Sequence, residues 1–270
     1  QPLMRTHHGS SECANWSFDR DAETVEHYRR WARIHTRLYP TYQALAAEAV
    51  AEGLPITRHP WLVAPEVRDL WAGQDVFFIG DDLFVAPVVE EGATGRDLQL
   101  PGAGWWPLFG EIAAGNPATV SAPATELPVY VRGGTILPLL IQAVDSHYGA
   151  SAEGLTDLGD EDGRLALALY PASDGSLDAI EVEGATISGT GFTGGVDWST
   201  ATLDGNALPG CQDEVVTSCA DDDNTLWVIG ESATVTVAGG GTLTIAPHTT
   251  SSDTTRTWRI GVGGAVWGAL

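Results

Sequence analysis

The sequence contains no lysine, one methionine and three cysteines among its 270 residues, so all 13 of its basic side chains are arginines. The absence of lysine is typical of codon bias in a GC-rich genome and needs no functional reason. The 36 acidic residues outnumber the arginines and give a formal net charge of −23. A field of that sign repels nucleic acids and anionic membrane surfaces, so we expect neither as a partner.

Long apolar runs are also missing, and no stretch approaches the ~20 residues that a membrane span requires. Cys211 and Cys219 flank a short polar segment, whereas Cys13 has no cysteine near it. We predict a disulfide between Cys211 and Cys219, with two free thiols as the alternative, and a free Cys13. Neither His nor a further Cys lies at zinc-ligand spacing. A disulfide and an acidic surface rich in Thr, Ser and Gly favour a secreted or periplasmic protein.

The helical pattern of this chain is confined to residues 21–52. Apolar or aromatic residues recur there at spacings of three and four, which predicts one buried stripe: Val25, Tyr28, Ala32, His35, Tyr39, Tyr42, Ala46 and Ala49. Asp19 or Asp21 is placed to cap the helix, and Gly53 to end it. Pro40 interrupts the pattern, so we expect two helices or one kinked helix.

Strand patterns follow the helical region. Residues 55–63 predict a short buried strand, and a helix followed by such a strand is typical of an α/β layer. From residue 76 the pattern becomes all-β, beginning with a hairpin around the turn at residues 80–82. Further strands are predicted at 97–100, 119–122, 129–131 and 135–137. After a loop or boundary at 145–163, a second all-β unit is predicted from strands at 165–170, 179–182, 185–188, 225–229, 234–237, 242–245 and 257–262.

Candidate polar sites are few. Arg5, His7 and His8 could form a cluster at the carboxyl end of a strand, where α/β barrels bind their ligands. Taken alone, a surface pair of histidines is the simpler interpretation, and no acidic or Cys partner lies at metal-ligand spacing. The acidic turns 160–162 and 221–223 could bind calcium, but solvated turns are the simpler reading. We expect no cofactor.

A series of short motifs occurs in a characteristic order along residues 2–137. The pieces are Met4-Arg5-Thr6-His7, Asn15-Trp16-Ser17-Phe18-Asp19, Arg37-Leu38-Tyr39-Pro40-Thr41-Tyr42, Glu48-Ala49, Gly53-Leu54-Pro55-Ile56-Thr57-Arg58, Asp82-Leu83-Phe84-Val85-Ala86-Pro87-Val88, Leu100-Pro101 and Pro128-Val129-Tyr130-Val131-Arg132-Gly133-Gly134-Thr135-Ile136-Leu137-Pro138. Each piece is unspecific by itself, but in this order they resemble the C-terminal part of glycoside hydrolase family 31.

The resemblance implies a fold class and a division into domains. Enzymes of this family are retaining α-glycosidases with a (β/α)8 barrel followed by β-sandwich domains, so we expect an α/β plus all-β chain. Residues 1–75 would be the C-terminal portion of the catalytic barrel, residues 76–140 the proximal β-sandwich, and residues 141–270 a distal β-sandwich-like domain. The distal part is placed by its position alone.

The resemblance also assigns roles to individual residues. The histidine of the Met-Arg-x-His motif binds the sugar at the cleavage subsite in this family, and that role transfers to His7. Arg5 would support it by holding carboxylates through charge-assisted bonds. Trp16 would either stack on a sugar face or pack at the top of the barrel. Arg58 sits at the position of the eighth strand, where a structural role is the simpler reading.

The two carboxylates that perform the chemistry in this family lie upstream of the first motif, and no aspartate in residues 1–75 matches them. Asp19 and Asp21 are better explained as helix caps. The chain begins at Gln1 with a functional motif and no methionine, so we expect it to be part of a longer polypeptide. We predict that the chain alone is inactive and acts with an upstream barrel segment, either cleaved from it or supplied as a companion chain.

The substrate is an α-linked glycoside or oligosaccharide by resemblance. The residues from Met4 to Thr24 resemble the sulfoquinovosidase branch more than the lysosomal or intestinal glucosidases. The chain departs from that branch at His8, where Glu is frequent, and its sequence at residues 57–61 differs from the commoner Arg-Pro-Leu-Phe pattern. The alternative function is that of a carbohydrate-binding or scaffolding β-sandwich protein with no catalytic activity. The ten tryptophans fit this alternative too, since tryptophan rings stack on sugars.

Overall fold

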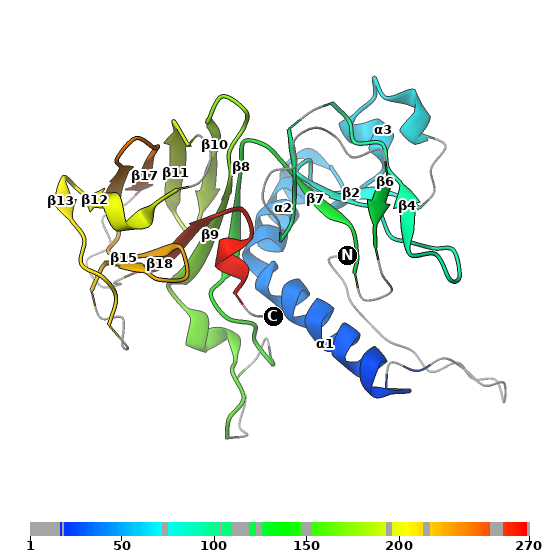
Figure 1. Ribbon diagram of the computed structural model, residues 1–270, viewed down its shortest axis with the longest axis horizontal. Helices are drawn as coiled ribbons and strands as arrows, with labels where there is room; N and C mark the ends of the chain where they lie inside the picture. The colour runs from blue at the N-terminus through cyan, green and yellow to red at the C-terminus, as the bar shows by residue number, and fades with distance from the viewer. Residues whose placement is uncertain are drawn as a thin grey trace.

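Two β-rich units lie on either side of a pair of helices, α1 and α2 (Figure 1). The larger unit, in green to red, occupies one end of the molecule, and the smaller unit with β2, β4, β6 and β7 occupies the other. The computed structural model describes residues 17, 19–71, 75–102, 104–109, 119–122, 126–146, 149, 153–192, 196–212, 217–248 and 256–268.

Helices α1 (Ala22–Arg37) and α2 (Tyr39–Glu52) form the predicted pair. The Asp21 carboxylate caps α1 by accepting a hydrogen bond of 2.8 Å from a backbone N–H of the first turn. Pro40 stands in the first turn of α2, where the N–H that proline lacks would have no helical partner. Gly53 ends α2 with φ of 76°, a left-handed conformation that glycine adopts without strain. The predicted break and both ends are therefore confirmed.

The buried face of these helices differs from the predicted stripe. The residues that are nearly inaccessible are Ile34, Arg37, Leu38, Pro40 and Thr41. The stripe residues are only partly buried, and Ala46 is exposed. Burial is concentrated at the junction of the two helices, where both β units contact them, because a periodic pattern shows which face is apolar but not how much of it finds a partner.

Residues 55–63 do not form the buried strand predicted for them. They contain the two-residue strand β1 (Thr57–Arg58) and the one-turn helix α3 (Pro60–Val63). Pro60 takes the first helical position, which it favours, and so ends the strand early. β1 pairs antiparallel with β2 (Phe77–Ile79) and therefore belongs to the first β unit. No parallel barrel strand occurs in the described part of residues 1–75.

The first β unit is an antiparallel sheet of order β1-β2-β3-β7-β5 beside the pair β4-β6. Its remaining strands are β3 (Leu83–Val85), β4 (Gly95–Asp97), β5 (Trp105–Pro107), β6 (Thr119–Ser121) and β7 (Val129–Arg132), and the short helix η1 (Arg68–Trp71) follows α3. β2 and β3 form the predicted hairpin. Phe78, Phe84 and Trp105 fill one side of the sheet with ring centroids 5.0–6.1 Å apart.

The distal unit is a β-sandwich of a six-stranded sheet (β10-β11-β17-β16-β12-β13) and a five-stranded sheet (β14-β15-β18-β9-β8). The strands are β8 (Thr135–Leu140), β9 (Arg164–Tyr170), β10 (Leu177–Val182), β11 (Ala185–Thr190), β12 (Ala201–Leu203), β13 (Asn206–Ala207), β14 (Cys219–Asp221), β15 (Thr225–Ile229), β16 (Ala233–Val237), β17 (Thr242–Pro247) and β18 (Thr257–Val262). Trp198 and Trp258 are fully buried in the core between the sheets. The all-β pattern predicted for this part is therefore confirmed.

One strand pair of the sandwich is parallel. β18 runs beside β9 from the pair Thr257–Arg164 to the pair Val262–Leu169, and β8 extends the same sheet through an antiparallel pair with β9. The strand β8, which ends at Leu140, thus belongs to the five-stranded sheet of the distal unit. The domain boundaries drawn from the sequence stay a prediction. None of the described helices combines the length and the apolar character that crossing a membrane requires.

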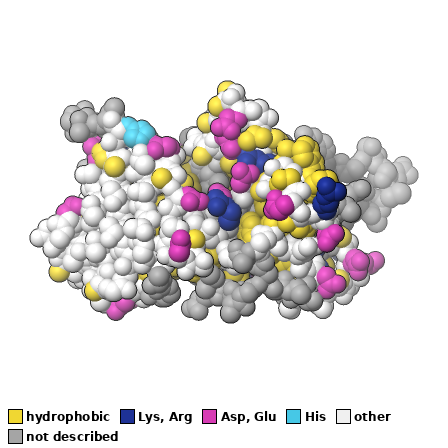
Figure 2. Space-filling view, turned by 90° about the horizontal axis from the view of Figure 1, so that it is seen from above, with side chains coloured by type: hydrophobic (Ala, Val, Ile, Leu, Met, Phe, Trp, Pro, Cys, Tyr) yellow, Lys and Arg dark blue, Asp and Glu magenta, His cyan; other side chains and the backbone are white. Residues whose placement is uncertain are grey.

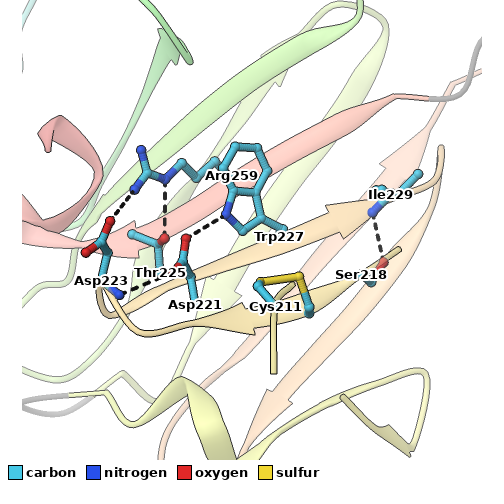
Figure 3. The surroundings of a disulfide bond; sticks show 9 residues. Cys211, Ser218, Asp221, Asp223, Thr225, Trp227, Ile229 and Arg259 are labelled. Carbon is cyan, nitrogen blue, oxygen red and sulfur yellow. Dashed lines mark hydrogen bonds and ion pairs between the residues drawn. A yellow bond between two sulfur atoms is a disulfide. The ribbon is translucent and has the colours of Figure 1, made fainter. Parts of the chain in front are cut away.

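The predicted disulfide joins Cys211 to Cys219 at the start of β14 (Figure 3). Two backbone hydrogen bonds of 3.0 Å hold the same ends of the loop, one from Cys211 to Ala220 and one from Ala220 to Pro209. Cys219 is buried and Cys211 partly so. Cys13 lies outside the described residues.

Candidate functional site

The sugar-binding residues predicted from the sequence, Arg5, His7 and Trp16, lie outside the described residues, so their arrangement stays a prediction. The described chain begins directly after them, at the start of α1. Asp19 there accepts a hydrogen bond from the Ser17 hydroxyl, and Asp21 caps the helix. The backbone hydrogen bond from Thr24 lowers the pKa of Asp21, as expected of a capping carboxylate. Both side chains thus serve local structure.

A groove of about 430 Å³ separates α1 from the first sheet. One wall comes from the helices, through Trp31, Leu38 and Tyr42, and the other from the sheet, through Phe77, Leu83 and Val85. Among the described residues that line it, none is a carboxylate. Most of the residues that line it are apolar, with His35 and Tyr42 as the exceptions, so the groove is suited to contact with an apolar surface.

A second hollow, of about 560 Å³, shares Trp31 with the groove and continues toward the polar residues His27 and Glu126. The Trp31 indole N–H is buried and has no hydrogen-bond acceptor in the described part of the chain. Burial also raises the pKa of the Tyr42 phenol, which stays neutral throughout the physiological range.

Arg58 lies at the opposite side of the helical pair and is almost inaccessible, with 2% of its side chain exposed. Its guanidinium donates to Glu48 and Asp81, both at 2.5 Å, and its Nε donates to the carbonyl of Pro55 at 2.9 Å. These bonds join α2 to the turn between β2 and β3. The structural role expected of Arg58 agrees with this position, although β1 is not a barrel strand here.

The acidic turns that could have bound calcium make other contacts. The Asp160 carboxylate accepts a hydrogen bond from the backbone of Asp157 in a capping box, at 2.8 Å. Asp221 accepts the indole N–H of Trp227 at 3.0 Å, and Asp223 lies 3.7 Å from Arg259 (Figure 3). In the described ranges no three His, Cys, Asp or Glu side chains gather in a way that could hold a metal ion.

Exposed apolar side chains gather on the same half of the molecule as the groove. Figure 2 shows hydrophobic side chains concentrated over the half that holds the first β unit, with acidic side chains scattered among them. Trp61 and Trp71, on α3 and η1, are 52% and 41% exposed. Exposed patches of this kind mark surfaces that contact other protein or ligand.

Sequence reasoning did not find the groove. Its walls come from α1 and from β2, β3 and β7, which lie far from α1 in the chain, and pairing across that distance leaves no periodic signal. The available hint was the presence of large apolar residues, Trp31, Ile34 and Leu38, beside the predicted stripe.

Part of this chain is similar to known proteins. Residues 53–137 match the model of the glycosyl hydrolase family 31 C-terminal domain. The chain is 34% identical over 146 residues to the sulfoquinovosidase of Escherichia coli (strain K12), covering 54% of this chain and 22% of that protein. It is 37% identical over 134 residues to the sulfoquinovosidase of Agrobacterium fabrum, covering 48% and 20%.

A solved structure shares the fold. The cycloalternan-forming enzyme from Listeria monocytogenes superposes with a TM-score of 0.59 and 17% identity, covering 84% of this chain and 24% of that one. The chain therefore spans only about a fifth to a quarter of the lengths of these relatives. The resemblance seen in the sequence motifs is confirmed, since residues 53–137 are similar to the C-terminal domain of glycosyl hydrolase family 31.

Proposed function

We propose that this chain is the C-terminal part of a retaining, exo-acting α-glycoside hydrolase. The observation that carries the proposal is the family match at residues 53–137, which is joined on its N-terminal side to the Met-Arg-Thr-His motif of the same family. In this proposal the nucleophile and the acid/base are aspartates of an upstream barrel segment. Residues 1–75 would supply the last portion of that barrel.

The surface of the first half of the chain supports an upstream partner. The helices α1 and α2 are buried at their junction and only partly buried or exposed elsewhere, and an apolar groove lies beside α1. Val50, Trp61 and Trp71 are exposed on the same half. A helix layer that lacks one neighbour has these properties, since an amphipathic helix is stabilised mainly by the surfaces that it buries.

In the proposed mechanism, residues of this chain bind the substrate and do not perform the chemical step. Retaining glycosidases use two carboxyl groups about 5–5.5 Å apart, one as nucleophile and one as acid/base. His7 would hydrogen-bond a sugar hydroxyl, and that bond strengthens as the ring flattens toward the oxocarbenium-like transition state. Arg5 would hold neighbouring carboxylates in place, and Trp16 would provide an apolar wall for the sugar ring.

An α-glucoside is the broader substrate proposal and a sulfoquinovoside the narrower one. The narrower proposal draws on two of the relatives, those of Escherichia coli and Agrobacterium fabrum, which are named sulfoquinovosidases. We also propose an oxidising compartment, secreted or periplasmic, for which the disulfide provides the support.

The test uses a longer protein that carries this chain after an upstream barrel segment. It should hydrolyse 4-nitrophenyl α-glucoside or the corresponding α-sulfoquinovoside, and the 270-residue chain alone should hydrolyse neither. His7→Ala should lower kcat/KM by about 10- to 100-fold, the loss expected of one hydrogen bond to a charged transition state. His248→Ala, on the distal sandwich, is the matched control and should have no effect.

Each result bears on a different part of the proposal. An inactive longer protein would favour the alternative of a non-catalytic carbohydrate-binding chain. Full activity of the His7→Ala variant would remove the sugar-binding role of that residue. Hydrolysis by the isolated chain would contradict the upstream location of the catalytic aspartates.

A further inference from the structure

The first sheet is apolar on both of its faces. Successive side chains of β2, β3 and β7 point to opposite faces, and both sets are hydrophobic. One set packs with residues of η1 and β6 and consists of Phe78, Phe84 and Tyr130. The other set faces α1 and consists of Phe77, Ile79, Leu83, Val85, Val129 and Val131. An antiparallel sheet with one face in water alternates between apolar and polar residues, so this sheet has the composition of an inner layer.

Helix α1 covers only part of the second face. Its residues Ile34 and Leu38 are buried in the same hydrophobic cluster as the sheet. The groove of about 430 Å³ remains between helix and sheet, and Phe77, Leu127 and Val129 on its sheet wall are only partly buried. Protein interiors are close-packed and contain few voids larger than a water molecule. The described residues therefore leave this core open along one side.

The walls of the groove are held in place by contacts across it. Arg30 of α1 forms an ion pair with Glu126 at 3.0 Å. The Trp31 ring meets the Phe109 ring edge-on, with the two centres 6.1 Å apart. These contacts fix the distance between α1 and the first β unit while the groove stays open, so we expect it to be filled from outside and not by movement of α1.

The lining of the groove restricts what can fill it. Apart from His35 and Tyr42, the described residues in its walls are apolar, and no Arg, Asp or Glu is among them. A charged group placed there would lose its water without gaining an ion-pair partner. A second copy of this chain is disfavoured as the occupant, because each copy carries a net charge of −23 and the two would repel each other.

The relatives indicate where an occupant can come from. The matches cover only 22% and 20% of the two sulfoquinovosidases, and residues 53–137 match a C-terminal domain. Most of the polypeptide in such proteins therefore lies outside the part that this chain resembles. A covalently continuous segment also docks at a high effective concentration, so a groove of this size can hold it firmly.

We propose that the groove between α1 and the first sheet receives an apolar segment from the upstream part of the longer protein, and that this segment completes the core. The inference rests on the proposed function only in placing this chain within a longer protein. It adds the surface at which the two parts dock and the chemistry of the docking segment, which contacts Phe77, Leu127 and Val129 through uncharged, apolar side chains.

The first test measures thiol labelling of folded protein, with the labelled position located by mass. Val129→Cys places a thiol in the groove wall, and Val89→Cys, at a site that is 66% exposed and outside the groove, is the matched control. Both variants also carry Cys13→Ala. The Val129→Cys thiol should react at least about tenfold more slowly in the longer protein than in the 270-residue chain, whereas the Val89→Cys thiol should react equally in both.

Two outcomes of the labelling would overturn the proposal. Equal reaction of the Val129→Cys thiol in both proteins would mean that the groove stays open in the longer one. Slow reaction in the 270-residue chain that depends on protein concentration would identify a second copy as the occupant.

The second test uses the longer protein alone and so does not depend on the stability of the shorter chain. Val129→Asp would place a carboxylate in the filled groove and should lower the melting temperature by at least about 4 °C, whereas Val89→Asp should change it by less than about 1 °C. Equal melting temperatures of the two variants would overturn the proposal. A longer protein that protects Val129 but hydrolyses neither glycoside would refute the glycosidase proposal alone, and an active one with an unprotected Val129 would refute the docking alone.

Discussion

Removal of the Cys211–Cys219 disulfide should destabilise the protein, because the unfolded chain gains conformational entropy when the loop is no longer closed. The bond closes a loop with a sequence separation of 8. The chain-entropy relation gives about 2.5 kcal/mol for a loop of this size. The two backbone bonds at Cys211 and Ala220 would persist in the folded variant, so little further loss is expected from rearrangement of the native loop.

The assay is urea unfolding followed by tryptophan fluorescence. The variant with both Cys211→Ala and Cys219→Ala should lose about 2.5 kcal/mol relative to wild type, and Cys13→Ala should lose almost nothing. Reduction of the wild type should reproduce the loss of the double variant. If the free energy of unfolding of the double variant lies within about 0.5 kcal/mol of the wild-type value, the disulfide does not stabilise the protein as expected. An equal loss in Cys13→Ala would contradict the prediction as well.

Three further predictions concern thiols, a buried charge and pH. A thiol reagent applied to denatured, unreduced protein should label only Cys13, and labelling of all three cysteines by mass would exclude the disulfide. Arg58→Met should lower the free energy of unfolding by about 2 kcal/mol, because its charge-assisted bonds to Glu48 and Asp81 are lost and rehydration of these two partly exposed carboxylates offsets only part of that loss. Arg29→Met, at an exposed position, should have a negligible effect in the same urea titration. Burial raises the folded pKa of the Asp82, Glu161 and Glu183 carboxyl groups, so their contribution to stability is largest at their ordinary values of about 4 and is lost as the pH rises through the folded values. The melting temperature should therefore be higher close to about pH 4 than at about pH 8, and a lower melting temperature near pH 4 would contradict their role.

Features that depend on neighbouring residues could be predicted from the sequence. The break at Pro40, the end at Gly53, the hairpin between β2 and β3 and most strands of the distal sandwich follow from local conformational preferences and alternation. The disulfide followed from two cysteines in one short loop. In each case the residues that determine the structure lie within about ten positions of one another.

Features that depend on distant pairing were missed. Residues 55–63 have the composition of a strand, yet Pro60 starts a helix and only Thr57–Arg58 finds a partner, in β2. The parallel pair of β9 and β18 and the groove beside α1 each join distant segments, which no local period records. Arg37 donates hydrogen bonds to the carbonyls of Leu140, Val266 and Trp267, and these partners become apparent only once the ends of β8 and of the short helix η4 (Gly263–Trp267) are folded against α1.

We propose that this chain belongs to a retaining glycosidase whose nucleophile lies upstream of it. Retaining enzymes pass through a covalent glycosyl-enzyme intermediate, which an activated fluorosugar traps. We would treat the longer protein with such a reagent, digest it and locate the added mass. The account predicts one labelled carboxylate outside residues 1–270 and none within them. A label on an Asp or Glu of this chain, or no label on an active protein, would contradict it.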